Sequence, residues 1–307
     1  MCGIVGFMSL DEKSWKNAKG HFAHYALMLD TLRGADSTGI ISVQDNFKVK
    51  TQHTTAPGTQ HVHHKRFHKL MDEDMWAFVG HNRAATAGSV KLENAHPFTF
   101  GDVTMVHNGT LYQQGRGMPT YDAKLEVDSM QIAKALSESE PKDAKKVLET
   151  IDGSFCLVWV DRRDQSVNMC RNSERPMHFG FNQQKDIMFF MSDGSHLKAI
   201  NSSFNRSAAK IQTIYSLDRM KICKWKKGSL SPEVESFRPF VRPVVKREVA
   251  GIQSPGAGSA LKRATDRWSK QLRGQNGSSK HASTDSVKAL INGETRKVPK
   301  AHVQELE

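Results

Sequence analysis

The chain has 307 residues, 38% of them hydrophobic, which is enough for one sizeable core and a tail and argues against a second large domain. It has no apolar run of about eighteen residues, and its N-terminus becomes charged too early for a secretory signal, so we expect a cytoplasmic protein without a membrane anchor. The net charge of +12 is compatible with a polyanionic partner, while four widely spaced cysteines argue against a zinc site and a disulfide framework.

Apolar periodicity predicts an opening strand at residues 1–9 and a helix at 15–32. Strands are then expected at 40–49 and 75–79, with a His-rich polar loop between them, and at 102–107, where Asn108 and Gly109 end the strand. Two short amphipathic helices follow at 128–136 and 142–151. Short strands are then expected at 154–161, 166–171, 177–181, 187–191 and within 211–225. The second half therefore reads as an antiparallel meander, and the whole as two sheets with a few helices.

A domain boundary is expected near residue 230. Residues 2–230 form the predicted domain, whereas residues 231–307 form a basic, low-complexity, flexible tail with 14 Lys and Arg against 8 Asp and Glu. Within this tail, residues 259–273 have the apolar spacing of a short basic helix that carries Trp268.

Cys2 becomes the first residue of the chain once Met1 is removed. The apolar residues 3–7 that follow it would hold this terminus rigidly in a core. A free α-amine beside the thiol has a pKa of roughly 8, so it can act as a base toward its own side chain near neutral pH. Taken alone, however, a cysteine at position 2 is more often inert.

Four ordered blocks of sequence give Cys2 a context: LRGADSTG at 32–39, GHNRAATAG at 80–88, NAHPF at 94–98 and VHNGTL at 106–111. With Cys2, this set resembles the class II glutamine amidotransferases, the N-terminal-nucleophile glutaminases found in glucosamine-phosphate synthase, amidophosphoribosyltransferase and asparagine synthetase. The resemblance covers about residues 2–200. It implies an α+β fold of the N-terminal-nucleophile hydrolase type, a four-layer αββα sandwich of two antiparallel sheets between helices.

The resemblance also implies roles for three residues of the reaction centre. Cys2 would attack the side-chain amide of L-glutamine, and the side chain of Asn108 with the N–H of Gly109 would stabilise the oxyanion. The alternative for Asn108 and Gly109 is a plain hairpin turn, because Asn-Gly is the favoured pair of type I′ turns.

Substrate binding is implied at Arg83, Thr86 and Asp128. Arg83 matches the arginine that clamps the substrate α-carboxylate, Thr86 lies beside it in the motif, and Asp128 matches the residue that pairs with the α-ammonium. Arg83 could instead be a surface arginine, and Asp128 a helix N-cap.

Two alanines depart from the glucosamine-phosphate synthase pattern, because Ala84 replaces a tryptophan and Ala87 a histidine. These changes put in doubt any close analogy for how the site closes. Arg33 and Asp36 are interpreted as structural support for the nucleophile, and the stretch around Ser192 as support for the fold only.

The cluster of His61, His63, His64 and His68 is interpreted as a solvated loop. His64 and His68 have the i, i+4 spacing of metal ligands, but no carboxylate or cysteine joins them at ligand spacing. We therefore expect no metal, and the resemblance implies no cofactor.

The leading hypothesis is a glutaminase that acts through a Cys2 thioester and supplies ammonia to a separate synthetase or transferase, because residues 231–307 are too few for an acceptor domain. The first alternative is an N-terminal-cysteine amidase or acylase of another specificity. The second is a degenerate glutaminase core whose basic tail binds nucleic acid through Trp268 and its Lys and Arg neighbours.

Overall fold

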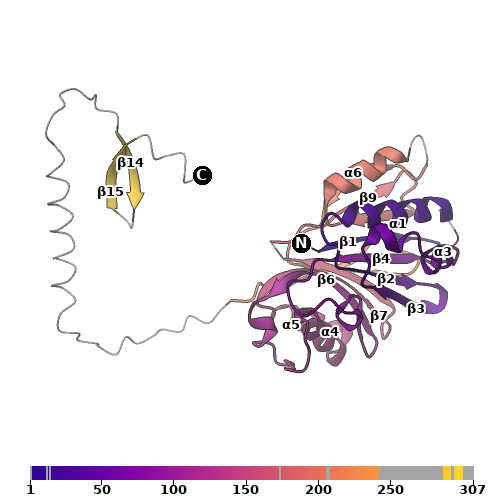
Figure 1. Cartoon of the computed structure of the whole chain (residues 1–307), viewed down its shortest axis with the longest axis horizontal. Coiled ribbons are helices and arrows are strands. Elements are labelled where there is room, and N and C mark those ends of the chain that lie inside the picture. The colour runs from indigo at the N-terminus through magenta and orange to yellow at the C-terminus, as the bar shows by residue number, and fades with distance from the viewer. Residues whose placement is uncertain are drawn as a thin grey trace. The chain divides into compact units, whose positions relative to one another are not determined.

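A computed structural model of the chain describes residues 2–11, 13, 15–172, 174–204, 208–241, 286–291 and 294–299 (Figure 1). The chain divides into two compact units, residues 1–243 and 244–307. In the second unit, β14 (Ser286–Ile291) and β15 (Glu294–Pro299) form an antiparallel pair. The helix predicted at 259–273 and Trp268 lie outside the described residues, so nucleic-acid binding by the tail stays a prediction.

Two antiparallel sheets form the centre of the first unit. The first sheet contains β1 (Gly3–Ser9), β2 (Ser37–Val43), β3 (Val49–Thr54), β4 (Ala77–Arg83), β9 (His178–Asn182), β10 (Ile187–Met191) and β11 (Ile211–Ser216), in the order β11-β9-β10-β1-β4-β2-β3. The second contains β5 (Phe98–Phe100), β6 (Val103–Leu111), β7 (Gly153–Asp161), β8 (Ser166–Arg171), β12 (Lys221–Lys226) and β13 (Glu233–Ser236), in the order β13-β12-β8-β7-β6-β5. The second sheet therefore includes a strand beyond residue 230.

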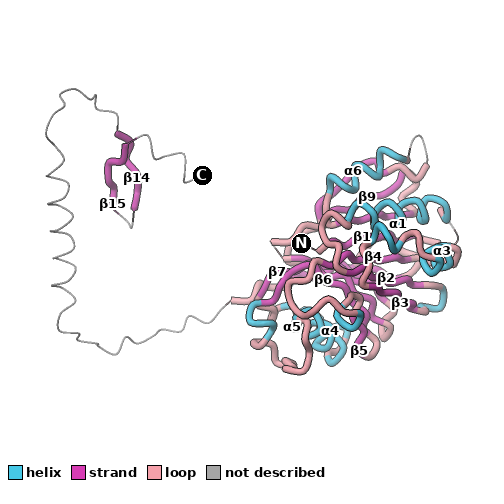
Figure 2. The backbone as a smooth tube through the Cα atoms, viewed as in Figure 1, coloured by secondary structure: helices cyan, strands magenta, loops and turns pink. Residues whose placement is uncertain are grey.

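Helices cover the outer face of each sheet, as Figure 2 shows. The first sheet is covered by α1 (Lys16–Asp30), α3 (Lys65–Met71) and α6 (Gly194–Ser203), with the short α2 (Gly58–His61) nearby, and the second by α4 (Asp128–Glu138) and α5 (Ala144–Leu148). Short 3-10 turns lie at Asp45–Phe47, Leu92–Asn94, Tyr112–Gly115 and Pro141–Asp143. Among the described residues, no helix combines the length and the apolar character that crossing a membrane requires.

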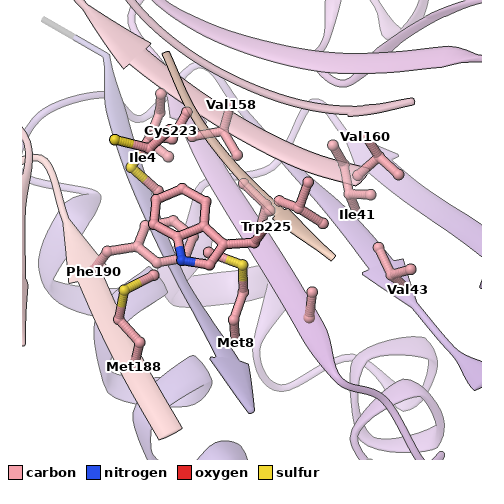
Figure 3. Close-up of a cluster of buried hydrophobic side chains, with 14 of the residues drawn as sticks. Ile4, Met8, Ile41, Val43, Val158, Val160, Met188, Phe190, Cys223 and Trp225 are labelled. Atoms are coloured by element: carbon pink, nitrogen blue, oxygen red, sulfur yellow. The ribbon is translucent and has the colours of Figure 1, made fainter. Parts of the chain in front are cut away.

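The alternation of side chains along the strands builds these layers. In β1, Ile4 and Met8 face the second sheet, whereas Val5 and Phe7 pack against the helices, because successive side chains of a strand point to opposite faces. Figure 3 shows the core between the sheets, where Ile4 and Met8 lie with Trp225 and other apolar side chains. The predicted four-layer αββα sandwich is confirmed.

Several predicted elements differ from the observed ones. The strand predicted at 40–49 is a hairpin of β2 and β3, because Asn46 and Phe47 have φ of 52° and 57° and turn the chain back. The His-rich segment predicted as a loop contains α2 and α3, and α6 was not predicted.

The strand expected to end at Asn108 and Gly109 instead continues to Leu111 as β6. Gly109 pairs with Phe155 of β7 in the sheet, so the hairpin-turn alternative is wrong.

Candidate active site

Cys2 immediately precedes β1, the central strand of the first sheet. Its Sγ lies against the backbone of Ala84, where it donates to the carbonyl oxygen at 3.4 Å and accepts from the N–H at 3.3 Å. Burial raises the pKa of the Cys2 thiol above its usual value. The thiol is therefore neutral near pH 7, and its use as a nucleophile requires a base close by.

An arginine between two carboxylates holds the backbone of Cys2. Arg33 Nε donates to the Cys2 carbonyl oxygen at 3.1 Å, and the same guanidinium lies 4.0 Å from Asp30 and 3.6 Å from Asp193. Asp30 is fully buried, and burial raises its pKa to about 7. A Cβ on Gly3 would lie 1.8 Å from Asp30 Oδ2, so only glycine fits beside the nucleophile.

Arg83 ends β4 and is 2% exposed, so it is not a surface arginine. Its Nη2 donates to the carbonyl oxygen of Ala87 and its Nη1 to that of Ser89 at 3.4 Å. A guanidinium has five N–H donors, so three remain for a ligand. Asp36 fixes the start of the same loop by accepting from the N–H of Ala85 at 2.7 Å. Arg33 and Asp36 therefore both support the surroundings of Cys2, as their positions in the sequence predicted.

Thr86 is exposed on this loop, which covers residues 84–91. Glu126 anchors the loop: its carboxylate accepts from the Ser89 N–H at 2.9 Å and pairs with Lys91. The Lys91 and Ser89 hydrogen bonds lower the pKa of Glu126 to about 2. The loop carrying Thr86 is thus held by a charged contact near Asp128.

Asp128 is the first residue of α4, and Val127 occupies the N-cap position, so the N-cap alternative is wrong. Its Oδ2 accepts from the N–H of Leu111 at 2.8 Å and its Oδ1 from the N–H of Ser129 at 2.8 Å. After burial, the Ala84 hydrogen bond and the charge of the chain's N-terminus, Arg83 lowers and Asp128 raises the pKa of the Cys2 thiol. Both charges therefore lie close enough to act on the sulfur.

Asn108 and Gly109 lie within β6, toward its C-terminal end, in the second sheet. The φ of Gly109 is 154°, and a Cβ there would lie 1.9 Å from the carbonyl oxygen of Ser154. Asn108 Nδ2 donates to Ser192 Oγ at 2.7 Å, and this hydroxyl also accepts from the Ile4 N–H at 2.9 Å. Ser192 thus connects Asn108 to the strand that carries Cys2. Sequence reasoning assigned Ser192 no such contact, and the only signal was a Ser-Asp pair after a predicted strand.

Two buried histidines, His107 and His81, lie beside Asn108. His107 Nδ1 lies 2.8 Å from Ser129 Oγ and its Nε2 3.3 Å from the Ser154 carbonyl oxygen, while His81 Nε2 lies 3.0 Å from the His107 carbonyl oxygen. Burial lowers the pKa of His107 and lowers that of His81 to about 3. These rings are neutral near pH 7, and they fix β6 rather than carry charge.

The four clustered histidines lie on α2, α3 and the short segment between them. His61 is 6% exposed and packs against Phe67, so its interpretation as part of a solvated loop is wrong, whereas His63, His64 and His68 are exposed. His64 Nδ1 accepts from the N–H of Arg66 at 3.1 Å as the N-cap of α3. In the described part of the chain, no group of three or more His, Cys, Asp or Glu side chains is arranged to hold a metal ion.

Comparison with known proteins identifies a family domain within the chain. A family model described as a glutamine amidotransferase domain matches residues 81–202, a range that includes Arg83, Asn108 and Asp128. Residues 81–202 therefore carry a glutamine amidotransferase domain.

The curated relatives of this chain are longer than it is. The 7-cyano-7-deazaguanine synthase of Saccharolobus solfataricus is 24% identical over 62% of this chain and 43% of its own length. The glutamine–fructose-6-phosphate aminotransferase of Sulfurisphaera tokodaii is 28% identical over 61% of this chain and 33% of its own length. This chain therefore spans less than half the length of these relatives.

The fold of the class II amidotransferases also matches. The solved structure of the glutamine phosphoribosylpyrophosphate amidotransferase of B. subtilis superposes with a TM-score of 0.58 and 17% identity, over 77% of this chain and 49% of that one. The match supports the sandwich fold of the domain.

Proposed function

We propose that this protein hydrolyses L-glutamine to glutamate and ammonia, with Cys2 as an N-terminal nucleophile. One observation carries the proposal: the Cys2 thiol lies on the backbone of Ala84, directly after the buried Arg83, and the charges of Arg83 and of the buried Asp128 both act on the pKa of this thiol. Free glutamine carries an α-carboxylate and an α-ammonium, so it needs this pair of charges at one end. An acyl amide needs neither, which argues against the acylase alternative.

The reaction begins after removal of Met1. The α-amine of Cys2 takes the thiol proton, Sγ attacks the side-chain amide carbon, and the carbonyl oxygen becomes an oxyanion that accepts from the Gly109 N–H and the Asn108 side chain. When the C–N bond breaks, the α-amine passes its proton to the departing ammonia. Water then hydrolyses the thioester to glutamate and restores the thiol. The raised pKa of the thiol makes such an adjacent base necessary.

Arg83 and Asp128 bind the substrate in this scheme. The three N–H groups of Arg83 that are not used by Ala87 and Ser89 would hold the α-carboxylate, and Asp128 the α-ammonium. Thr86, exposed on the loop that Arg83 contacts, would lie beside the carboxylate.

We further propose that the ammonia is used by a separate synthetase or transferase in the cytoplasm. Support comes from the relatives, a synthase and an aminotransferase of which this chain covers 43% and 33%. The four cysteines are free, which suits a reducing compartment.

Labelling with diazo-oxo-norleucine, an electrophilic glutamine analogue, tests the nucleophile without any partner. We expect intact mass to show loss of Met1 and one added label, peptide mapping to place the label on Cys2, and free glutamine to slow the reaction. Cys2→Ser should abolish both labelling and glutamate formation, whereas the matched variant Cys223→Ser, at a buried cysteine of the core between the sheets, should retain both. Retention of Met1, or labelling of another cysteine, would overturn the proposal.

A further inference from the structure

Ser192 follows β10 at the junction between the two sheets and is fully buried. It lies opposite Ile4, because Val5 pairs with Met191 in the register of β1 and β10. The Ser192 N–H donates to the Ile4 carbonyl oxygen at 2.8 Å, and the Ser192 Oγ accepts from the Ile4 N–H at 2.9 Å. The backbone N–H and carbonyl oxygen of Ile4, two residues after Cys2, are therefore both hydrogen-bonded to Ser192.

The same hydroxyl reaches the other sheet. Ser192 Oγ accepts from Asn108 Nδ2 at 2.7 Å, and Asn108 is 3% exposed. A hydroxyl oxygen has two lone pairs, and these two N–H groups use both of them. One buried oxygen atom thus joins the strand of the nucleophile to the side chain proposed to stabilise the oxyanion.

The contact with Ser192 fixes the orientation of the Asn108 side-chain amide. The amide group of Asn108 is planar and has two N–H groups on one nitrogen, so a hydrogen bond through the first fixes the direction of the second. A donor stabilises an oxyanion only when it is already aimed at the position where charge develops. The orientation of Asn108 relative to β1 is therefore set by Ser192 rather than by solvent.

We infer that Ser192 is a positioning residue for the oxyanion hole: its hydroxyl holds the Asn108 amide in register with the strand that carries Cys2. The inference rests on the proposed glutaminase reaction. Ser192 does not touch the reacting atoms, and it acts through Asn108. Its loss should therefore weaken the transition state and leave the binding of glutamine by Arg83 and Asp128 largely intact.

The expected decrease in kcat follows from the role of Asn108, the hydrogen-bond donor that Ser192 orients. Removal of one oxyanion-hole donor lowers kcat by about 10²–10³-fold. Loss of its orientation should cost part of this, so we expect Ser192→Ala to lower kcat by roughly 10–100-fold while KM for glutamine changes by less than about threefold. Affinity for the γ-aldehyde analogue of glutamine, whose adduct with Cys2 places an oxyanion in the hole, should fall in parallel with kcat.

The experiment compares Ser192→Ala, Asn108→Ala and the double variant with wild type in the full chain. Because Ser192 acts through Asn108, the double variant should be about as slow as Asn108→Ala alone. Ser192→Cys keeps the shape of the side chain but replaces the oxygen by a somewhat larger sulfur, which is a weak acceptor, so it should show the same kcat loss even if Ser192→Ala does not fold. Ser42→Ala is the matched control, since Ser42 is a buried serine of the same sheet whose hydroxyl has no hydrogen-bond partner, and it should leave kcat unchanged.

Wild-type kcat in a folded Ser192 variant, or multiplicative losses in the double variant, would overturn the inference. A rise in KM without loss of kcat would also overturn it. None of these results touches the proposed function, which fails separately if wild type neither hydrolyses glutamine nor is labelled at Cys2.

Discussion

Gly109 provides a direct test of the oxyanion hole, through the substitution Gly109→Ala. The added Cβ would lie 1.9 Å from the Ser154 carbonyl oxygen and 2.4 Å from His107 Nε2, both far inside van der Waals contact. The backbone carbonyl belongs to β7, so it cannot move without disturbing the pairing of Gly109 with Phe155. The φ of 154° is also unfavourable for any residue with a side chain.

The unfavourable φ and the close contacts of the added Cβ should each destabilise Gly109→Ala. The unfavourable backbone conformation costs about 1–3 kcal/mol, and overpacking a filled site costs about another 1–3 kcal/mol. Together they remove a substantial part of a typical stability of about 5–15 kcal/mol. Because any relaxation displaces the Gly109 N–H, we also expect kcat to fall by about 10²–10³-fold, the usual cost of one lost oxyanion donor.

Thermal unfolding and glutamate release measure the two effects separately. Gly20→Ala is the matched control: Gly20 lies within α1, and its new Cβ would meet no atom within 4 Å, so this variant should gain about 0.5–1 kcal/mol and keep its activity. If Gly109→Ala kept the Tm and kcat of wild type, the tight contact with β7 and the role of this N–H would both be refuted.

Three further variants test the charges around the nucleophile. Arg83→Lys should raise KM for glutamine by about 10–100-fold with a smaller change in kcat, because lysine lacks the planar fork that grips a carboxylate, and an unchanged KM would contradict this role. Asp30→Asn should become more stable relative to wild type as the pH rises from 5 to 7, as denaturation at both values would show. The folded pKa of Asp30, about 7, exceeds its unfolded value, so wild type loses up to about 1.4 kcal/mol per pH unit between these two pKa values, and the loss levels off above the folded pKa. Glu126→Gln should raise KM without lowering Tm, because it removes the charge at position 126 that holds Ser89 and Lys91 of the Thr86 loop, and equal KM values would speak against the anchor.

The fold class and the order of most elements could be predicted from the sequence. The apolar run in residues 3–9 and the helical spacing of Phe22 and Ala26 predicted buried elements, and these residues are buried, whereas Leu32 of the same predicted helical face is 79% exposed. A prediction failed where one local sequence pattern is compatible with two structures. Asn-Gly normally turns a chain, but at 108–109 the backbone stays in β6, because pairing with β7 along the whole strand outweighs the local turn preference.

For the candidate site, the sequence motifs identify the candidate residues Cys2, Arg83, Asn108 and Asp128. They do not predict which other residues hold these side chains in place. By itself the sequence predicted the sandwich, through ordered motifs that resemble a known family, and it named the nucleophile and the substrate-binding charges that we propose, because such motifs are local properties of the chain. Only the tertiary structure decided that Ser192 joins Asn108 to Ile4, and that Asp30 lies buried behind Gly3. Such contacts join residues as much as 188 positions apart, and no local pattern records which distant side chain will lie within hydrogen-bonding distance.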